Sequence, residues 1–416
     1  MSYPSVDDTE MLTLRDTPGK QSTIAYVGTY PPNACGIATF LLDLVNSTDL
    51  AGLRSIVMAV SEDPIEYDDP KVVLRLEQQK LSDYVLAADT VKRQGASLLC
   101  IQHEYGIYGC DHGYYILELA DRCDVPIVVT LHTVLPDPSP MQREVILRLA
   151  ERATAFVVMA HKGVELLERY GIARSKIRMI PHGAPMVVGG AEKLAKNKFG
   201  LSDRKVISTF GLISPNKGIE DAIDALPEVV LNHPEVLYLI LGQTHPAIVK
   251  RYGEEYRESL EAQVDRLGLR NHVQFVNRYL SLQDLLDYLL ATDIYVTPYY
   301  ANPNQITSGT LAYAMGAGKV IVSTPYTHAE ELLADGRGYL FPFRYSPTLS
   351  GIISELLDHP EEYQATKALA TEFGKTISWP RVGIDYIKLY GEAIGSEFDV
   401  DRRISRALAL LESQKL

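Results

Sequence analysis

Short apolar segments rich in β-branched residues alternate along the chain with longer stretches whose apolar residues recur at helical spacing. This alternation is typical of βα units, in which helices cover both faces of a parallel sheet. The pattern occurs twice, with predicted strands at residues 23–28, 55–60, 98–102, 126–131, 155–159 and 177–180, and then at 206–211, 237–242, 273–276, 294–298, 320–323 and 338–341. We therefore predict two α/β domains with Rossmann-like sheets.

A polar stretch with glycine and lysine clusters, residues 189–205, separates the two series of strands, and we place the domain boundary near Lys196. From Trp379 onward the apolar spacing is helical and no strand is predicted. The predicted organisation is a loose N-terminal arm (1–20), a first domain (21–195), a second domain (196–378) and a helical C-terminal segment (379–416) that packs back on both domains.

Composition narrows the class of protein. With 416 residues the chain is long enough for two or three domains with substantial cores. A net charge of -13 argues against nucleic acid as the main partner. The cysteines form no CxxC pair, which favours reduced thiols and a cytoplasmic location. No apolar run reaches the ~18 residues of a membrane span, so no transmembrane segment is expected. The sequence does not indicate an oligomeric state.

The turns after the predicted strands are the places to look for chemistry, because open parallel sheets bind ligands beyond the carboxyl ends of their strands. The first turn, VGTYPPNACGIATF, brings Gly36 to the start of a helix, where it allows close approach of a phosphate or a sugar hydroxyl. The turn has no GxGxxG pattern, which argues against a nicotinamide dinucleotide. A tight turn in which Gly36 serves only the backbone conformation is an equally open interpretation.

Three further turns of the first half carry histidines: His103 with Glu104 in QHEYG, His132 in LHT, and His161 in MAHKG. A single histidine most often has a structural role, but histidines at the ends of successive strands converge on one edge of a sheet. We expect ligand contacts there, above all from His132. For His182, in IPHG, a structural role and a ligand contact are both open.

The second half offers two places for an anion. In FGLISPNKG, Lys217 precedes a helix and can reach an anion held at helix N-termini, although a surface lysine is the simpler interpretation. Ser308, Gly309 and Thr310 open a helix of small residues directly after a polar loop, which makes a second anion cradle. A small-residue helix packed in the core is compatible with that role.

The segments YPPNACGIATF, LHT, IPHG, GLISPNKG and YAMGAGKVIVSTPYTHAEELLADGRGYLF occur in the order seen in the retaining glycosyltransferases of family four, and the chain resembles that family over roughly residues 22–395. The resemblance implies the B-type glycosyltransferase fold: two facing Rossmann-like domains with an interdomain cleft and a C-terminal crossover helix. It also implies that the first domain binds the acceptor and the second binds a nucleotide-sugar donor.

The resemblance implies roles for individual residues. Gly36 matches the glycine that approaches the donor diphosphate, and His132 matches the histidine near the reacting sugar. Lys217 matches the lysine whose charge stabilises the leaving diphosphate. Ser308, Gly309 and Thr310 are the further candidates for binding the donor phosphates. On the acceptor side the candidate contacts are Tyr30, His103, Glu104 and His161.

The chain also departs from the family pattern. The clamp arginine falls on Leu212, and the family's two glutamates fall on Gln305 and Tyr313. Gln305 can hydrogen-bond a sugar but cannot ionise. Tyr313 lies in TLAYAM, which is similar to the TQLYAM stretch of bacterial glycogen and starch synthases, where the tyrosine ring faces the nucleotide base.

We therefore expect a retaining hexosyltransferase that moves glucose or mannose from a nucleoside-diphosphate sugar to a sugar or glycoside acceptor, with no metal and no other cofactor. In this fold the departing phosphate is usually taken as the base for the acceptor hydroxyl. A glycoside phosphorylase is the alternative suggested by the run SGT, which is similar, with an offset of one position, to the phosphate-binding run of glycogen phosphorylases. A non-catalytic sugar-binding homologue is the alternative suggested by Leu212 and Gln305.

Overall fold

The structure, a computed structural model, describes residues 22–186, 190–302, 304, 306–395 and 398–413. The chain forms two compact units. The C-terminal unit comprises Ala184–Asn302 and Ser308–Ser378, and the N-terminal unit comprises the remaining described residues, including Trp379 and those that follow it. Within the described ranges, no helix is both long and apolar enough to cross a membrane.

A seven-stranded parallel sheet, in the order β3-β2-β1-β4-β5-β6-β7, forms the centre of the N-terminal unit. Its middle strands are buried on both faces, which explains their continuous apolar sequences. The strands are β1 (Thr23–Gly28), β2 (Arg54–Ser61), β3 (Val72–Glu77), β4 (Leu98–His103), β5 (Ile127–Leu131), β6 (Ala155–Val158) and β7 (Ile177–Met179).

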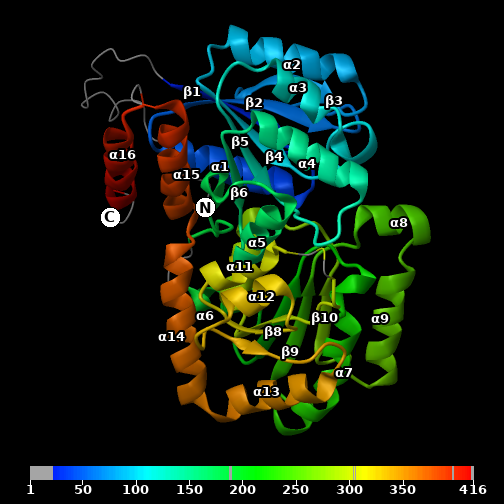
Figure 1. The fold of residues 1–416 in the computed structure, drawn as a ribbon. Coiled ribbons are helices and arrows are strands. Elements are labelled where there is room, and N and C mark those ends of the chain that lie inside the picture. Colours follow the sequence, from blue (N-terminus) through cyan, green and yellow to red (C-terminus); the bar gives the residue numbers. More distant parts are fainter. Residues whose placement is uncertain (1–21, 187–189, 303, 305, 396–397, 414–416) are drawn as a thin grey trace. The chain divides into compact units, whose positions relative to one another are not determined.

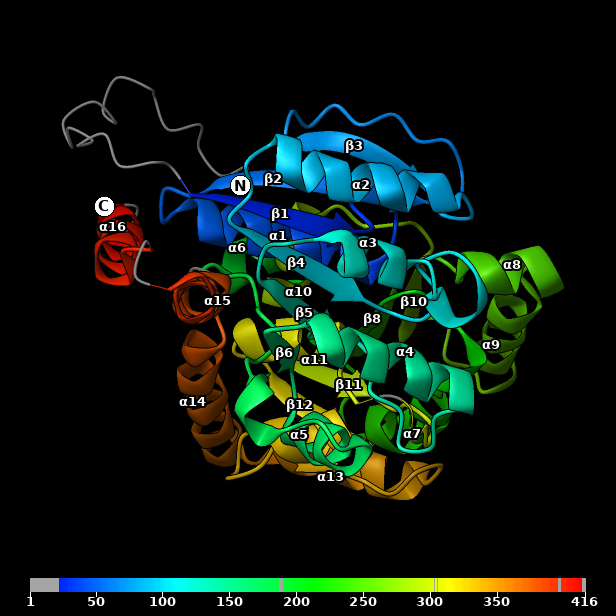
Figure 2. The same ribbon diagram turned by 45° about the horizontal axis from the view of Figure 1, so that its top comes forward.

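Helices cover both faces of this sheet (Figures 1 and 2). One apolar core lies under α2, α3, α4 and α5, and a second core lies under α1, α15 and α16. The helices are α1 (Gly36–Asp49), α2 (Leu81–Arg93), α3 (Ile116–Arg122), α4 (Pro140–Arg152), α5 (His161–Tyr170), α15 (Trp379–Ile394) and α16 (Val400–Ser413), with 3-10 turns at Asp111–Gly113 and Arg174–Lys176.

Local sequence explains where such helices begin. At the start of α4 the Ser139 side chain accepts a hydrogen bond from the backbone N–H of Gln142, and the Gln142 side chain accepts one from the Ser139 N–H. Pro140 occupies the first helical position, where its missing N–H costs nothing. The two reciprocal bonds satisfy N–H groups that the helix itself leaves free.

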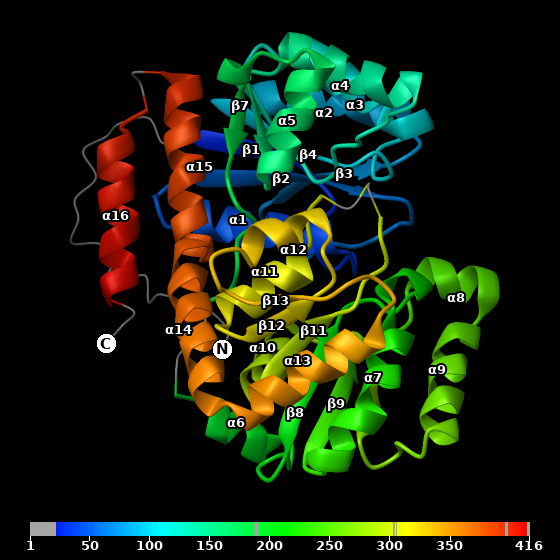
Figure 3. The ribbon, with the colours of Figure 1, turned by 60° about the horizontal axis from the view of Figure 1, so that its bottom comes forward.

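The C-terminal unit repeats the plan with a six-stranded parallel sheet in the order β10-β9-β8-β11-β12-β13. Helices α7, α9 and α13 cover one face, and α6, α10, α11, α12 and α14 cover the other (Figure 3). The strands are β8 (Lys205–Phe210), β9 (Val236–Leu241), β10 (Val273–Val276), β11 (Ile294–Thr297), β12 (Val320–Ser323) and β13 (Tyr339–Leu340). The helices are α6 (Glu192–Lys198), α7 (Ile219–Asn232), α8 (Pro246–Tyr252), α9 (Glu255–Arg266), α10 (Leu282–Ala291), α11 (Gly309–Gly316), α12 (Thr327–Leu332), α13 (Ser346–Asp358) and α14 (Pro360–Thr376), with a 3-10 turn at Pro215–Lys217.

The prediction of two α/β sheets is confirmed, and every predicted strand is present within a residue or two of its expected ends. Strand β3 was not predicted. It lies at the edge of its sheet, most of its residues are only partly buried, and it follows β2 without an intervening helix. The C-terminal segment is helical as predicted, and α15 and α16 pack on each other in the N-terminal unit (Figure 3). The two units divide between Gly183 and Ala184, and Lys196 lies inside α6.

Each sheet has one place where the direction of strand addition reverses, between β1 and β4 in the N-terminal unit and between β8 and β11 in the C-terminal unit. Loops leave such a pair of strands in opposite directions, so a crevice opens at their carboxyl ends, and open α/β sheets bind ligands there. The topology thus directs attention to the loops after β1 and β4, and after β8 and β11.

Candidate functional site

Lys217 stands at the end of the loop that follows β8. A 3-10 turn carries Lys217 and stops at Gly218, whose backbone is left-handed (φ 59°). A side chain on Gly218 would approach the Pro298 carbonyl oxygen to 2.0 Å, so only glycine fits there. This close approach brings the loop after β8 against the loop after β11. The Lys217 ammonium nitrogen lies 3.8 Å from the centre of the Tyr299 ring, within cation–π range.

Tyr299 also contacts the start of α11. Its hydroxyl lies 2.9 Å from the Thr310 hydroxyl, and that hydroxyl lies 3.1 Å from the Ser308 hydroxyl. Ser308 caps α11, since its side chain accepts a hydrogen bond from the Leu311 N–H. The Ser308 N–H in turn donates to Nδ1 of the buried His328 at 2.9 Å. One buried tyrosine therefore joins the lysine to the N-terminus of the helix.

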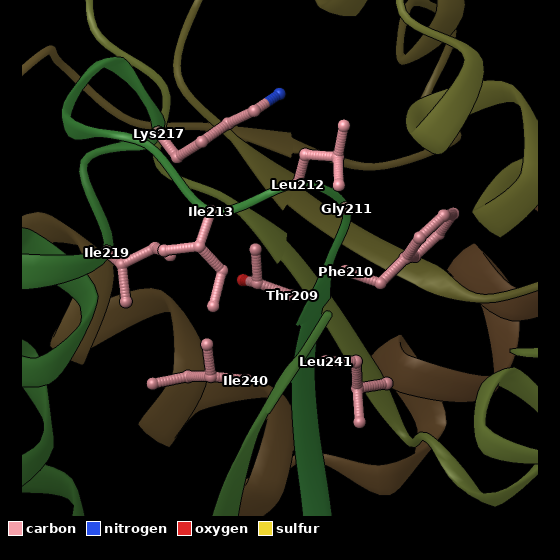
Figure 4. Close-up of a pocket in the computed structure, with 9 residues that line it drawn as sticks. All are labelled: Thr209, Phe210, Gly211, Leu212, Ile213, Lys217, Ile219, Ile240 and Leu241. Atoms are coloured by element: carbon pink, nitrogen blue, oxygen red, sulfur yellow. The ribbon is translucent and has the colours of Figure 1, made fainter. Parts of the chain in front are cut away.

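A small pocket opens beside this arrangement, between the end of β8 and the start of α7 (Figure 4). Lys217 and Leu212 point to one side of it, and Ile240 and Leu241 lie on the opposite side. Apart from Lys217 and Thr209, the side chains that line the pocket are apolar. Leu212, which the resemblance implies to stand where the family has its clamp arginine, thus adds no charge to this wall.

The remaining donor-side candidates are placed as follows. Gly309 is the first residue of α11. Tyr313 lies in the same helix, is 7% exposed, and packs with its ring centre 6.4 Å from that of Phe210. Gln305 falls outside the described residues. The C-terminal unit therefore brings together Lys217, Ser308, Gly309 and Thr310: one ammonium, two hydroxyls and the positive end of a helix dipole. Together these groups suit a phosphate or diphosphate.

In the N-terminal unit the candidate groups gather after β4 and β5. The backbone N–H of His132 donates to the backbone carbonyl oxygen of His103 at 3.0 Å, which joins the ends of β4 and β5. The His132 Nε2 atom lies 3.0 Å from the Gln102 side-chain oxygen, within hydrogen-bond distance. The Phe40 ring, from α1, meets the rings of both His132 and His182 edge to face, at 4.8 and 5.1 Å. Phe40 thereby holds two histidines in place.

These histidines are neutral at physiological pH. Burial lowers the pKa of His103 to about 4, and that of His182 to about 4. Burial lowers the pKa of His132 to about 3, with a smaller contribution from the two neighbouring histidines. A neutral imidazole donates and accepts hydrogen bonds but brings no charge. The cluster therefore suits sugar hydroxyls better than phosphates.

The other acceptor-side candidates differ in accessibility. Glu104 is partly buried and accepts hydrogen bonds from the Thr133 hydroxyl (2.5 Å) and the Tyr105 N–H (2.9 Å), and burial raises its pKa. His103 is fully buried, and neither of its ring nitrogens has a hydrogen-bond partner in the described part of the chain. Tyr30 is 1% exposed and donates its hydroxyl to Asp69 at 2.8 Å. These placements favour structural roles for His103 and Tyr30.

Two candidates lie at helix starts on the surface. His161 is exposed at the first position of α5. Gly36, the first residue of α1, is exposed, and a side chain placed on it would meet nothing within 4 Å. Its φ lies outside the left-handed region, so the backbone alone does not require glycine there. The space above Gly36 is consistent with the close approach of a ligand.

Sequence reasoning missed several residues of these sites, namely Phe40, Tyr299 and His328, together with Tyr300, whose N–H donates to the Asn216 carbonyl oxygen beside Lys217. The two tyrosines follow β11 after Pro298, as the loop of Lys217 follows β8, and this shared position after adjacent strands could have indicated them. Phe40 and His328 act from helices, through contacts that no spacing in the sequence predicts. No group of three or more histidine, cysteine or acidic side chains that could hold a metal occurs among the residues with described positions.

Comparisons with known proteins found family matches in both halves of the chain. Residues 35–186 match the family model described as Glycosyltransferase Family 4, and residues 192–373 match the model described as Glycosyl transferases group 1. Among curated relatives, spore coat protein SA of Bacillus subtilis is 22% identical over 57% of this chain and 64% of its own length. Mannosylfructose-phosphate synthase of Agrobacterium fabrum is 26% identical over 64% of this chain and 49% of its own length. The chain thus spans about half to two thirds of these relatives.

Among solved structures, HepE of Anabaena, crystallised with UDP, superimposes with a TM-score of 0.66 at 18% identity. The match covers 94% of this chain and all of HepE. Both sheets and their helices thus have the arrangement of B-type glycosyltransferases, as expected from the sequence. Two family models, one for each half of the chain, match in the same order as the two units. The chain belongs to the glycosyltransferases of family four.

Proposed function

We propose that this protein is a retaining hexosyltransferase that transfers glucose or mannose from a nucleoside-diphosphate sugar to a sugar or glycoside acceptor. The observation that carries the proposal is the linkage, through Tyr299, of the Lys217 ammonium to the N-terminus of α11. The known ligands of similar proteins support it: HepE has been crystallised with UDP and with UDP-glucose. Mannosylfructose-phosphate synthase, a relative, is named for a product that contains a mannosyl group.

In this proposal the C-terminal unit stabilises the leaving group. As the bond between the sugar and the diphosphate breaks, negative charge grows on the diphosphate oxygens. Lys217 and the start of α11 are already held in place through Tyr299, so little reorganisation is needed when that charge develops. The departing phosphate accepts the proton of the acceptor hydroxyl while the acceptor oxygen bonds to the anomeric carbon on the face that the diphosphate leaves, which retains the anomeric configuration. No other cofactor and no metal are part of the proposal.

The N-terminal unit binds the neutral part of the reaction. His132 and Glu104 present a neutral imidazole and a carboxyl group that is partly buried and already hydrogen-bonded. Such groups fix the orientation of sugar hydroxyls by donating and accepting hydrogen bonds. Gly36 leaves room for the donor to approach α1, and His161 is an exposed candidate for an acceptor contact.

We also propose a cytoplasmic location, supported by the four free cysteines.

Calorimetric titration of the purified protein with UDP, GDP, ADP and inorganic phosphate tests this function without knowledge of the acceptor. Binding of one nucleotide is expected, and it identifies the base of the donor. Incubation with the matching UDP- or GDP-linked glucose and mannose and a panel of sugar acceptors then tests transfer, and the anomeric proton coupling of the product tests retention. Failure of every nucleotide to bind would contradict the proposal.

A glycoside phosphorylase is the second candidate, favoured by the Ser308 and Thr310 hydroxyls beside Tyr299 and Lys217. That enzyme would bind inorganic phosphate in the titration and release sugar 1-phosphate from an oligosaccharide without nucleotide. A non-catalytic sugar-binding protein, motivated by Leu212 and Gln305, would bind ligands but turn over no donor. The three outcomes are distinct in the same pair of experiments.

A further inference from the structure

Lys217 lies on the face of a buried aromatic ring, and the ring itself is held firmly. Tyr299 is 1% exposed and stacks on Tyr326 with ring centres 5.4 Å apart and an angle of 15°. Its hydroxyl is bonded to Thr310, and its carbonyl oxygen accepts a hydrogen bond from the Thr324 hydroxyl at 2.6 Å. A lysine stem is flexible, and a fixed aromatic face beneath its ammonium group restricts where the charge can be.

The Tyr299 ring can fix Lys217 only if the loop after β11 keeps its position against the loop after β8. Tyr300, the next residue after Tyr299, joins these two loops. The Tyr300 N–H donates to the Asn216 carbonyl oxygen at 3.0 Å, directly beside Lys217. The Tyr300 hydroxyl donates to Glu220 Oε1 at 2.6 Å, in the first turn of α7. The loop after β11 is thus tied to the loop after β8 on both sides of Lys217, once through the backbone and once through a carboxylate.

Glu220 is itself fixed from the other side. Its second oxygen accepts a hydrogen bond from the hydroxyl of Tyr256, in α9. The Glu220 backbone carbonyl accepts another from the Gln263 side chain at 3.0 Å. The Arg344 guanidinium lies 4.2 Å from the centre of the Tyr300 ring, which restrains that ring further. The hydrogen bond between Tyr300 and Glu220 is therefore partly buried, and further contacts hold each of the two side chains in place.

We propose that Tyr300 and Glu220 are positioning residues that hold the Tyr299 ring beneath Lys217 and so set the location of the lysine charge at the anion site. Neither residue lines the pocket beside Lys217, so both act through the loop that they join. The consequence for nucleotide binding rests on the function proposed above, whereas the placement of Lys217 does not.

The two tyrosines on Glu220 provide a matched pair of variants. Tyr300→Phe and Tyr256→Phe each remove one hydroxyl from the same carboxylate, but only Tyr300 belongs to the loop that carries Tyr299. In protein reductively methylated with ¹³C, the methyl resonance of Lys217, assigned with Lys217→Arg, is expected upfield because of the Tyr299 ring current. We expect Tyr300→Phe to move this resonance toward that of exposed lysines and Tyr256→Phe to leave it in place.

Binding of the nucleotide gives the second readout. Tyr300→Phe is expected to raise the dissociation constant of the nucleoside diphosphate at least threefold, with Tyr256→Phe within twofold of the unaltered protein. An unmoved Lys217 resonance in Tyr300→Phe, or equal movement in both variants, would overturn the inference. If Tyr300→Phe does not fold, Glu220→Gln replaces it and must move the same resonance. A shifted resonance in a protein that binds no nucleotide would uphold the positioning role and refute the proposed function.

Discussion

The two sheets present different chemistry at the carboxyl ends of their strands. In the C-terminal unit the loops after β8 and β11 bring an ammonium group, two hydroxyls and a helix N-terminus together, all of which suit an anion. In the N-terminal unit the loops after β4 and β5 bring together histidines that burial keeps neutral. The same fold thus provides one charged and one uncharged binding edge, and a reaction between a diphosphate sugar and a polyol needs one of each.

This contrast also shows that residue type alone does not define a site. His103 is the last residue of β4 and Lys217 follows β8, and each of these strands lies next to the reversal of its sheet. His103 is fully buried between tyrosines, whereas Lys217 is partly exposed on a tyrosine ring. His103 is therefore enclosed by its own unit, whereas Lys217 is accessible to a ligand.

The largest effect is expected from the backbone beside Lys217. Gly218→Ala would place a methyl group against the Pro298 carbonyl at a left-handed φ, and we expect it to lower the free energy of unfolding of the C-terminal unit by about 3 kcal/mol or more. Gly268→Ala is the matched control: its φ is also positive, but nothing lies within 4 Å, so about 1 kcal/mol is expected. Hydrogen exchange of β8 and β11 measures both. Equal losses would show that the close approach of the loops does not matter.

Acid should weaken the N-terminal unit. The unfolded chain binds protons on its histidines below pH ~6.5, while the folded unit keeps His103 neutral down to about pH 4, so stability falls as the pH drops through this window. His103 alone should contribute roughly 2–4 kcal/mol of this loss. The fluorescence of the single tryptophan, Trp379, which is buried in this unit, follows the unfolding in urea.

The pH effect can be assigned to one residue. His103→Phe keeps an aromatic ring between Tyr105 and Tyr108 but cannot titrate, so its urea midpoint should depend less on pH between 4 and 6.5. His161→Gln, at an exposed position, should keep the original slope. If His103→Phe and the unaltered protein lose stability in parallel, His103 is not responsible.

A smaller effect is expected at His132, which we propose to bind a sugar hydroxyl. His132→Asn should reduce kcat/KM about tenfold, the equivalent of one hydrogen bond of ~1.4 kcal/mol. Because its pKa is about 3, His132 should add no limb near pH 6.5 to the pH–rate profile of the unaltered enzyme. His359→Asn, in the C-terminal unit, is the control. A limb near pH 6.5 that disappears in His132→Asn would mean that His132 exchanges protons during turnover.

The smallest effect is expected from an arginine introduced at position 212, where the resemblance implies the family's clamp arginine. Leu212→Arg adds a guanidinium on the same side of the pocket as Lys217, and we expect severalfold tighter binding of a nucleoside diphosphate, as for one added charge-assisted hydrogen bond in water. Leu231→Arg adds the same charge at a position of α7 that is 81% exposed. Calorimetry compares the two. An equal gain from both variants would reveal only a general effect of net charge.

The sequence was informative where local pattern and topology decide the structure. Strand and helix periodicity predicted both sheets, and the position of Lys217 after a strand predicted its place at the sheet edge. The half-exposed strand β3 was not predicted, because an edge strand lacks the continuous apolar run of its neighbours. Nothing in the sequence shows that the Lys217 ammonium lies over the Tyr299 ring or that the Phe40 ring packs against His132, since these contacts join elements that only the fold brings together.

The most direct test of the charged edge compares a nucleoside diphosphate with its nucleoside. For Lys217→Met, calorimetry should show at least a tenfold loss of affinity for the diphosphate and an unchanged affinity for the nucleoside, because only the diphosphate meets the lysine charge. Lys193→Met, an exposed lysine of α6, should change neither. If Lys217→Met binds the diphosphate as tightly as the unaltered protein does, the loops after β8 and β11 are not the anion site.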